Sequence, residues 1–244
     1  MLEAALFAAL AASSLLIGAA VGITGRVSLR VMGVIMAFGA GALISALAFE
    51  LTDEAFSLGG GDAVAIGLAL GALTYFGGDE LIARTGETRR SRRRHGEPDA
   101  AQGPKALLLG AVLDGIPESV VIGISLLHGE GVSIPIIVAV FLSNFPEALS
   151  SARGMRAAGH SPSKIFAVWV LVVLISAAAA AIGYGVLGGA SDNTVGLILA
   201  FAGGAVLTML ADTMMPEAFS YGHRATGLFT VLGFAAAYLL STAS

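Results

Sequence analysis

Long apolar stretches constrain this sequence more than any other feature. Stretches of roughly 20 mainly apolar residues match the hydrocarbon core of a bilayer, which is about 30 Å thick. They occur at residues 2–24, 31–51, 62–82, 106–127, 133–153, 164–187, 195–215 and 225–243. None of them alternates apolar and polar residues as a membrane β-strand would. The sequence therefore predicts an all-α integral membrane protein with eight transmembrane helices.

The composition excludes the other broad classes of protein. Of the 244 residues, 56% are hydrophobic and only 12% are charged, whereas a soluble chain carries about 25% charged residues. The absence of cysteine excludes a disulfide-stapled secreted fold. The shortage of polar residues excludes a disordered chain.

The first apolar stretch has two interpretations. Residues 2–24 resemble a cleaved signal peptide in their alanine content, but such a peptide begins with a positively charged leader. The only early side-chain charge here is Glu3. We therefore favour a retained helix.

The positions of the basic residues predict an orientation. All 13 lysines and arginines fall in alternate connections, and seven of them lie within residues 84–105. The intervening connections carry acids and no base: Asp53, Glu54, Asp62, Glu130 and Asp192. By the positive-inside rule, the arginine-rich 84–105 loop is cytoplasmic and both termini are extracytoplasmic, as in a multi-pass protein of the cell (inner) membrane. A nucleic-acid-binding patch is the less favoured interpretation of this basic run, and we expect no nucleic-acid partner.

Two segments of the chain resemble each other. Residues 37–56 and 200–219 match at nine of 20 positions without a gap, at an offset of 163 residues. Because their helices are predicted to run in opposite directions, the match indicates an inverted repeat, an architecture common among secondary transporters. Chance similarity between two helices rich in alanine and glycine is the alternative. The predicted organisation is residues 1–83 (helices 1–3, first repeat), 84–105 (cytoplasmic loop), 106–153 (helices 4 and 5) and 154–244 (helices 6–8, second repeat).

The central helices carry acids at mid-membrane depth. Asp114 and Glu118 lie four residues apart and share one helix face, as do Ser143 and Glu147, with Asn144 adjacent. Each charged group at this depth costs about 2.5–3.5 kcal/mol, and no predicted span contains a mid-membrane lysine or arginine. The available counter-charges are protons or a metal cation, for which carboxylate, amide and hydroxyl oxygens are suitable ligands.

A proline precedes the glutamate in each central helix. Pro117 and Pro146 each remove one backbone hydrogen bond, which would free the carbonyl groups of Leu113 and Leu142 as further ligands. Ordinary membrane-helix kinks are the alternative. Glu50, Asp53, Asp212 and Glu217 are weaker candidates for stations on a transport pathway, since acids near helix ends often only meet solvent.

These motifs resemble the ZIP (Zrt/Irt-like protein) family of divalent-metal transporters. The resemblance covers the predicted helix count, the position of the termini, the long 3–4 loop and the Pro-Glu motifs. The helix-4 signature of the family, His-Asn-x-Pro-Glu-Gly, corresponds here to Asp114-Gly115-Ile116-Pro117-Glu118-Ser119. The helix-5 motif corresponds to Ser143-Asn144-Phe145-Pro146-Glu147-Ala148.

The resemblance implies which residues bind metal. Glu118 and Glu147 would be the central ligands, Asp114 would take the place of the usual histidine, and Ser143 and Asn144 would support them. Loss of the histidine and its following asparagine predicts one oxygen-dominated site, which favours Mn²⁺ or Fe²⁺ over Zn²⁺ more than is usual in the family. Zn²⁺ remains a candidate substrate. The resemblance also implies a homodimer and movement of helices 1, 4, 5 and 6 as one unit.

The sequence thus predicts a transporter rather than an enzyme. It would move a divalent transition metal (Zn, Mn or Fe) toward the cytoplasm, with no permanently bound cofactor and with membrane lipid and a second copy as its other partners. No nucleotide-binding loop is present, so an ion gradient or the membrane potential would supply the energy. The main alternative is a proton-coupled carrier of another solute that uses the carboxylates as a proton relay. An intramembrane aspartyl hydrolase is the least favoured hypothesis.

Overall fold

The computed structural model describes residues 1–84, 104–127 and 131–243, and every regular element in these ranges is helical. Six helical stretches of this described part are long and apolar enough to cross a membrane. The fold is therefore all-α, with the apolar helices expected of a membrane-embedded protein. Most of the predicted 84–105 loop lies outside the described residues.

The helices follow one another with few intervening residues. In chain order they are α1 (Leu2–Thr24), α2 (Leu29–Ala46), η1 (Leu47–Leu51), α3 (Thr52–Arg84), α4 (Pro104–Ser125), α5 (Ile134–Ala157), α6 (Pro162–Leu187), α7 (Asp192–Met209), η2 (Leu210–Met214), α8 (Met215–Gly222), η3 (His223–Ala225) and α9 (Thr226–Ala243). Serine side chains at positions 28, 133, 161 and 191 accept hydrogen bonds from backbone N–H groups in the first turns of α2, α5, α6 and α7. These caps begin each helix at the residue where its apolar run starts.

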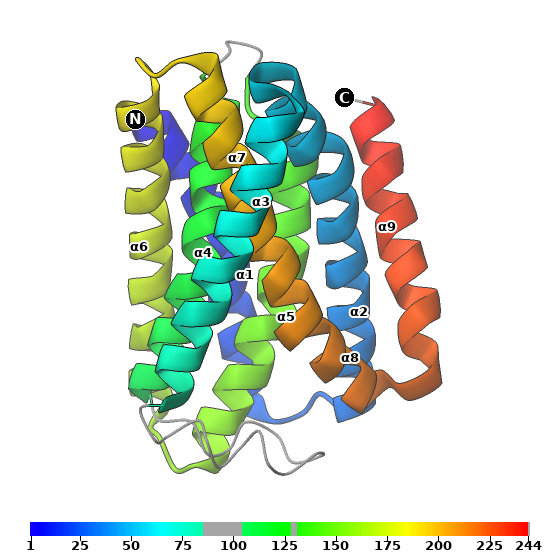
Figure 1. Ribbon diagram of the computed structural model, residues 1–244. Coiled ribbons are helices and arrows are strands. Elements are labelled where there is room, and N and C mark those ends of the chain that lie inside the picture. Colours follow the sequence, from blue (N-terminus) through cyan, green and yellow to red (C-terminus); the bar gives the residue numbers. More distant parts are fainter. Residues whose placement is uncertain (85–103, 128–130, 244) are drawn as a thin grey trace.

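Two of the six stretches reverse direction inside what is otherwise continuous helix. Leu29–Arg84 has 56 residues, roughly 84 Å if it were straight. It is broken at Gly60, where φ is 70° and ψ is −178°, a conformation that glycine adopts at little cost. Asp192–Ala243 has 52 residues and turns at His223, where φ is 52° and ψ is −129°. Figure 1 shows the chain turning back after each of these points.

The bundle has two ends, which we name by what lies there. Both termini lie at the end that is uppermost in Figure 1, and we call it the termini side. The opposite end, where α3 finishes and α4 begins, is the loop side. Along α2 and α4 the residue numbers rise toward the termini side, and along α3, α5 and α7 they rise toward the loop side.

The helices pack in two groups. In the first group α1 packs against α5 and α6, and α4 packs against α6. In the second group α3 packs against α7, and α2 packs against α8 and α9. The main contacts between the groups are those of α2 with α5 and of α4 with α7.

Glycine allows the closest backbone approaches within the groups. A Cβ atom on Gly41 of α2 would lie 1.9 Å from the Thr230 carbonyl oxygen of α9, and one on Gly204 of α7 would lie 2.2 Å from the Leu68 carbonyl oxygen of α3. In the first group, a Cβ atom on Gly18 of α1 would lie 2.2 Å from the Phe145 carbonyl oxygen of α5. Small residues permit such tight packing between membrane helices, so each group is tightly packed internally.

Helices that are related by the 163-residue offset also have corresponding neighbours. The 163-residue offset maps α2 onto α7, and it maps Gly41 onto Gly204. α2 packs against α9 and α5, whereas α7 packs against α3 and α4. Such corresponding contacts are expected when two copies of one helical unit are related by a two-fold axis, as in an inverted repeat.

The same offset relates two π-helical turns that the sequence analysis does not predict. η1 begins at Leu47 and η2 at Leu210, and each has five residues. π-Helical turns are rare and frequently occur at functional sites. Both lie within the segments that resemble each other in sequence.

The helix positions agree closely with the predicted apolar ranges, but two predicted connections are helical. Residues 52–59 continue the helix as far as Gly60, and residues 216–222 continue it as α8. The apolar pattern ends earlier because these turns carry acids such as Asp53, Glu54 and Glu217. Polar helical turns extend beyond an apolar span at no cost in backbone hydrogen bonding, so hydropathy alone underestimates helix length.

Candidate functional site

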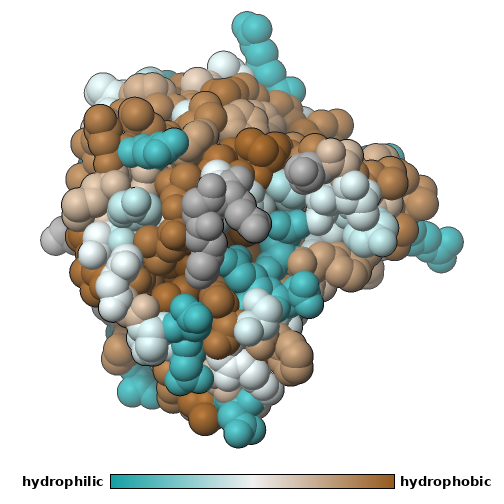
Figure 2. All heavy atoms as spheres, turned by 90° about the horizontal axis from the view of Figure 1, so that it is seen from above, coloured by the Kyte–Doolittle hydropathy of each residue, from teal (hydrophilic) through white to brown (hydrophobic). Residues whose placement is uncertain are grey.

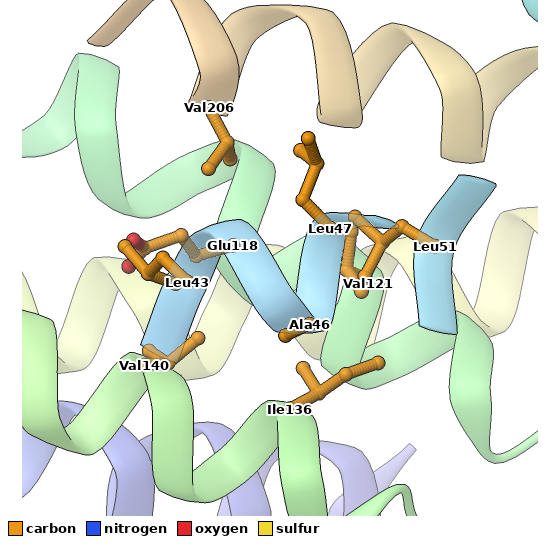
Figure 3. A pocket seen from close by; sticks show the side chains of 9 residues that line it. All are labelled: Leu43, Ala46, Leu47, Leu51, Glu118, Val121, Ile136, Val140 and Val206. Carbon is orange, nitrogen blue, oxygen red and sulfur yellow. The ribbon is translucent and has the colours of Figure 1, made fainter. Parts of the chain in front are cut away.

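Glu118 is a buried acid at the centre of the bundle. Only 4% of the residue is exposed, and its Oε2 atom has no hydrogen-bond partner among the described residues. It lines a cavity of about 20 Å³, close to the volume that one water molecule needs. Figure 3 shows its carboxylate beside Leu43, and the other side chains labelled there are hydrocarbon. A buried carboxylate without a donor is unstable as a bare anion, so a proton or a cation must accompany it.

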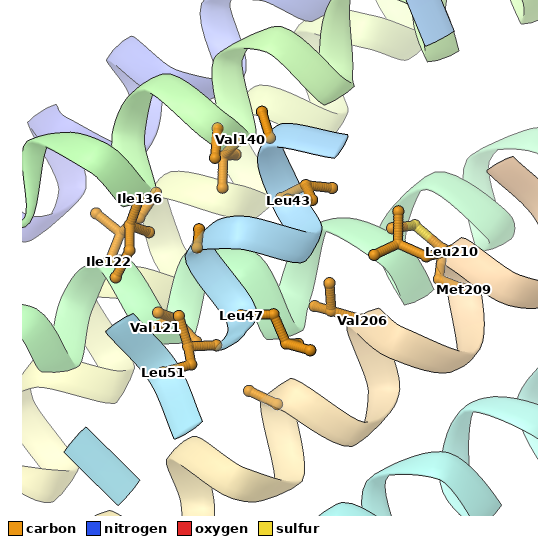
Figure 4. Packing of buried hydrophobic residues seen from close by; sticks show 14 of the residues in the cluster. Leu43, Leu47, Leu51, Val121, Ile122, Ile136, Val140, Val206, Met209 and Leu210 are labelled. Atoms are coloured by element: carbon orange, nitrogen blue, oxygen red, sulfur yellow. The ribbon is translucent and has the colours of Figure 1, made fainter. Parts of the chain in front are cut away.

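Hydrocarbon side chains cover Glu118 toward the termini side. Leu47 and Leu51 of η1, Val121 of α4 and Ile136 of α5 line the same cavity and are all buried. We call these four residues the apolar layer, and Figure 4 shows it as part of the packed core between α2, α4, α5 and α7. Leu43 and Val206, which the 163-residue offset relates, also line the cavity.

A larger cavity opens beyond the apolar layer, on the termini side. Its volume is about 740 Å³, and we call it the vestibule. Its lining includes three acids and four serines: Glu50, Asp53, Glu54, Ser57, Ser125, Ser133 and Ser241. Figure 2 looks onto this end and shows hydrophilic residues gathered toward the middle of the face. The vestibule and the Glu118 cavity share no lining residue.

Polar residues lie on the other side of Glu118, toward the loop side. Glu147 of α5 is half-buried and close enough to Asp114, Glu118 and Glu217 for electrostatic interaction with all three. Three residues further along α5, the Ser150 hydroxyl donates a hydrogen bond to Glu217 Oε1 of α8. Acids and hydroxyls therefore continue from Glu118 toward the loop side.

Asp114 has a partner that the sequence analysis does not identify. The Tyr75 hydroxyl of α3 donates a hydrogen bond of 2.6 Å to Asp114 Oδ1. Thr213 of η2 lies near the same tyrosine, and Asp79, one turn further along α3, interacts electrostatically with both Tyr75 and Asp114. Tyr75 is 4% exposed, so this contact is enclosed between the two groups of helices.

The predicted ligands are neighbours but not a closed coordination shell. Ser143 and Asn144 are buried on α5 just before Glu147, and the Ser143 hydroxyl donates to the Val140 carbonyl oxygen at 3.0 Å. The Leu142 carbonyl oxygen lies against α2, 2.8 Å from where a Cβ atom on Gly39 would be. Within the described ranges, no three histidine, aspartate or glutamate side chains lie together as a metal would require. Of the predicted ligands, only Glu118 lines the small cavity.

The four acids predicted as weaker candidates for a transport pathway lie in different parts of the bundle. Glu50 accepts hydrogen bonds from Ser133 (3.0 Å, to Oε2) and from Ser241 (to Oε1), so it joins α5 and α9 at the edge of the vestibule. Asp53 lines the vestibule. Glu217 lies beside Glu147 on the loop side. Asp212 lies exposed on η2, away from the Glu118 cavity lining.

Two residues near the site, Asp79 and Tyr75, were not among the predicted site residues, although their positions in the sequence point to them. Asp79 lies inside the predicted span 62–82, where an acid is as unusual as in helix 4. Tyr75 precedes it by four residues and therefore shares its helix face. Nothing in the sequence pairs Tyr75 with Asp114, because their contact depends on how α3 packs against α4.

No protein-family model matches the chain, and no curated protein sequence matches it.

Proposed function

We propose that the chain is a secondary transporter, similar to the ZIP family, that carries a divalent transition-metal cation across the membrane toward the cytoplasm. The observation that carries this proposal is Glu118, a buried carboxylate with an unpartnered oxygen and two further acids close by. A site of this kind needs a positive charge. A divalent cation would be its substrate.

The helical reversals support eight membrane crossings. With breaks at Gly60 and His223, the two longest helical stretches each cross the bundle twice. Both termini then share one side, and α3 ends and α4 begins on the other. The arginines that lie between these two helices in the sequence favour a cytoplasmic loop side by the positive-inside rule.

The arrangement of polar residues supports a route for the cation. A metal bound by Glu118 and Glu147 has Asp114 beside it, and the acids and hydroxyls toward the loop side offer oxygen ligands on the way to the cytoplasm. The apolar layer separates the same site from the vestibule. Alternating access requires this layer to part so that the site can reach the vestibule. The two groups of helices, each tightly packed internally, are suited to such relative movement.

Uptake into proteoliposomes loaded with a metal-sensitive dye tests the proposal. Wild type is compared for Zn²⁺, Mn²⁺, Fe²⁺ and Mg²⁺ with Glu118→Gln and Glu147→Gln, which remove the charges with little change of shape. Glu3→Gln, at the exposed start of α1, is the matched control. We expect saturable uptake of a transition metal by wild type and the control, and loss of uptake in both site variants. Absence of metal uptake by folded, inserted wild type would refute the proposal.

One observation favours the proton-coupled carrier as a second candidate. Glu118 lies in an apolar cavity without a partner for Oε2, which suits a protonated carboxyl group as well as a metal ligand. In that case the liposomes would show no metal uptake but a proton flux that Glu118→Gln abolishes. Parallel recording with a pH-sensitive dye separates the two functions.

A further inference from the structure

Three arginines lie close together where α2 begins on the loop side. Arg26 belongs to the connection from α1 to α2, Arg30 to the first turn of α2 and Arg224 to η3, and all three are exposed. α2 contacts η3, and a Cβ atom on Gly33 of α2 would lie 2.4 Å from the Gly222 backbone nitrogen at the end of α8. Figure 1 shows the connection from α1 reaching the lower end of α2 beside α8 and the start of α9. We call the three arginines the basic corner.

A hydrogen bond from α5 anchors one part of the basic corner. Arg153 is half-buried, and its Nη1 atom donates a hydrogen bond to the Val27 carbonyl oxygen, next to Arg26 in sequence. The connection that carries Arg26 is therefore attached to α5 as well as to α2. Arg153 also brings a fourth positive charge to this connection.

Acids are absent from the sequence around the basic corner. Residues 24–49 and 218–243, which include α2, α9 and the connections that lead into them, contain no aspartate or glutamate. Glu217, just before the second range, accepts a hydrogen bond from Ser150 of α5. Within the described residues, no ion pair involves an arginine of the basic corner. This part of the surface is therefore positively charged.

Helix stability does not account for Arg30. It lies in the first turn of α2, which contains no acid. The N-terminal end of a helix carries partial positive charge, so a cation there destabilises the helix. A negatively charged partner outside the helix would offset this repulsion.

Exposed hydrocarbon lies beside the basic corner, further into the bundle. Val31 follows Arg30, and Phe219 and Leu228 lie within five residues of Arg224 on α8 and α9. Their exposed fractions are 50%, 62% and 63%. A soluble anion would gain nothing from these side chains. A phospholipid has both a phosphate group for the arginines and acyl chains for the hydrocarbon.

We propose that the basic corner binds the headgroup of an anionic phospholipid, whose acyl chains lie against Val31, Phe219 and Leu228. Arginine suits this role because its planar guanidinium group binds phosphate through two parallel hydrogen bonds. A lipid at this position contacts α2, α8 and α9 together and thereby stabilises the second group of helices. Lipid binding here does not depend on which solute the protein carries.

Thermal unfolding of the purified full chain in neutral detergent tests the proposal. Phosphatidylglycerol or phosphatidylcholine is added in increasing amounts, and the shift of the midpoint gives an apparent affinity. The corner variant combines Arg30→Gln with Arg224→Gln. Its matched control combines Arg156→Gln with Lys164→Gln, which removes the same charge from exposed positions at the loop-side ends of α5 and α6.

We expect phosphatidylglycerol, but not phosphatidylcholine, to stabilise wild type and the control. In the corner variant, the apparent affinity for phosphatidylglycerol should fall about 10-fold or more, because each arginine near an anionic surface contributes about fivefold. Equal losses in the corner variant and the control would indicate only a general attraction between a basic surface and anionic lipid, and would overturn the proposal. Equal stabilisation by the two lipids would also overturn it.

Two further measurements complete the test. Inorganic phosphate at millimolar concentration should not stabilise wild type, and stabilisation that saturates in this range would identify a site for free phosphate instead of lipid. If the corner variant does not fold, the single variant Arg224→Gln should weaken the affinity for phosphatidylglycerol about fivefold. An unchanged affinity in that variant would refute the proposal.

Discussion

The two sides of Glu118 are built from equivalent helices but lined by opposite chemistry. Toward the termini side, Leu51 and Val121 close the cavity with hydrocarbon. Toward the loop side, Ser150 and Glu217 meet through a hydrogen bond. Val121 follows Glu118 by three residues, and Ser150 follows Glu147 by three residues. Equivalent positions beside two equivalent Pro-Glu motifs thus hold valine on one side and serine on the other.

The backbone architecture and the chemistry that lines the site are therefore separable. The packing of α2 on α9 mirrors that of α7 on α3, so the scaffold treats both sides alike. Only the side chains at a few positions make one side apolar and the other polar. We infer that these side chains, rather than the fold, determine which side of Glu118 offers polar groups to a cation.

Close helix contacts on the two sides should be equally sensitive to an added methyl group. Gly41→Ala and Gly204→Ala would each place a Cβ atom within 2.2 Å of a carbonyl oxygen of a neighbouring helix. Both variants should lose about 3 kcal/mol or more of stability, because backbone cannot yield as a side chain can. Thermal unfolding in detergent, monitored by circular dichroism, measures this. Gly77→Ala, whose Cβ atom would meet nothing within 4 Å, is the matched control. If only one of the two variants is destabilised, the equivalence of the two sides is wrong.

The second prediction compares metal uptake by variants of two acids, Glu147 beside Glu118 and Glu50 at the edge of the vestibule. Glu147→Gln should lower metal uptake about 100-fold, beyond most effects of residues that only orient a ligand. Glu50→Gln should lower it at most a few-fold, since the amide oxygen can accept from one of the two serine hydroxyls, Ser133 or Ser241, while the amide N–H donates to the other. Initial rates of uptake into proteoliposomes measure both. Equal losses would contradict the assignment of Glu50 to the vestibule edge rather than to the site.

A smaller effect is expected in the apolar layer. Leu47→Ala should cost about 2 kcal/mol of stability, the low end for a buried leucine. It should also enlarge the Glu118 cavity beyond one water molecule. Unfolding in detergent gives the stability, and proton leak into liposomes reports water entry. Leu239→Ala, on an exposed part of α9, is the control and should change neither quantity. An unchanged leak in Leu47→Ala would show that the layer does not form the barrier.

The smallest effect concerns the polar contact on the loop side. Ser150→Ala removes the hydroxyl that donates to Glu217 and should cost about 1 kcal/mol, the usual value of one hydrogen bond. Ser13→Ala is the matched control, because the Ser13 hydroxyl bonds only within its own helix, to the Leu10 carbonyl oxygen. The difference in unfolding free energy between the two variants isolates the contact between α5 and α8. No difference would mean that this contact contributes nothing to the closure of the groups.

Much of the architecture is predictable from the sequence because apolar length is a local property. The described helices begin and end within a few residues of the predicted spans wherever a serine cap or a polar connection is close by, as at Ser28 and Ser161. The π-helical turns at Leu47 and Leu210 are not predictable, since a shift from i→i−4 to i→i−5 bonding leaves the hydropathy pattern unchanged. The burial of Glu118 follows from the rule that intramembrane acids face the bundle interior.

The contacts of the site were less accessible to prediction. The bond from Tyr75 to Asp114 joins residues 39 positions apart, and it exists because glycines bring α3 close to α7 and α4. Val121 and Ser150 can be read from the sequence. That they occupy corresponding positions on opposite sides of Glu118 becomes clear only when α4 and α5 are aligned by their Pro-Glu motifs.

The most direct test of the central claim uses the absence of cysteine in the chain. Ser150→Cys and Val121→Cys, each as the single cysteine, are exposed to a membrane-impermeant maleimide from one side of the membrane at a time. Ser150 and Val121 are both buried, at 3% and 2% exposure, so reaction at either position reports an opening of the bundle. The account predicts that Ser150→Cys reacts faster from the cytoplasmic side than Val121→Cys does from the opposite side, and that the transported metal slows the reaction of Ser150→Cys. Reaction of Val121→Cys from the vestibule at an equal or greater rate, or labelling of Ser150→Cys that is insensitive to metal, would contradict it.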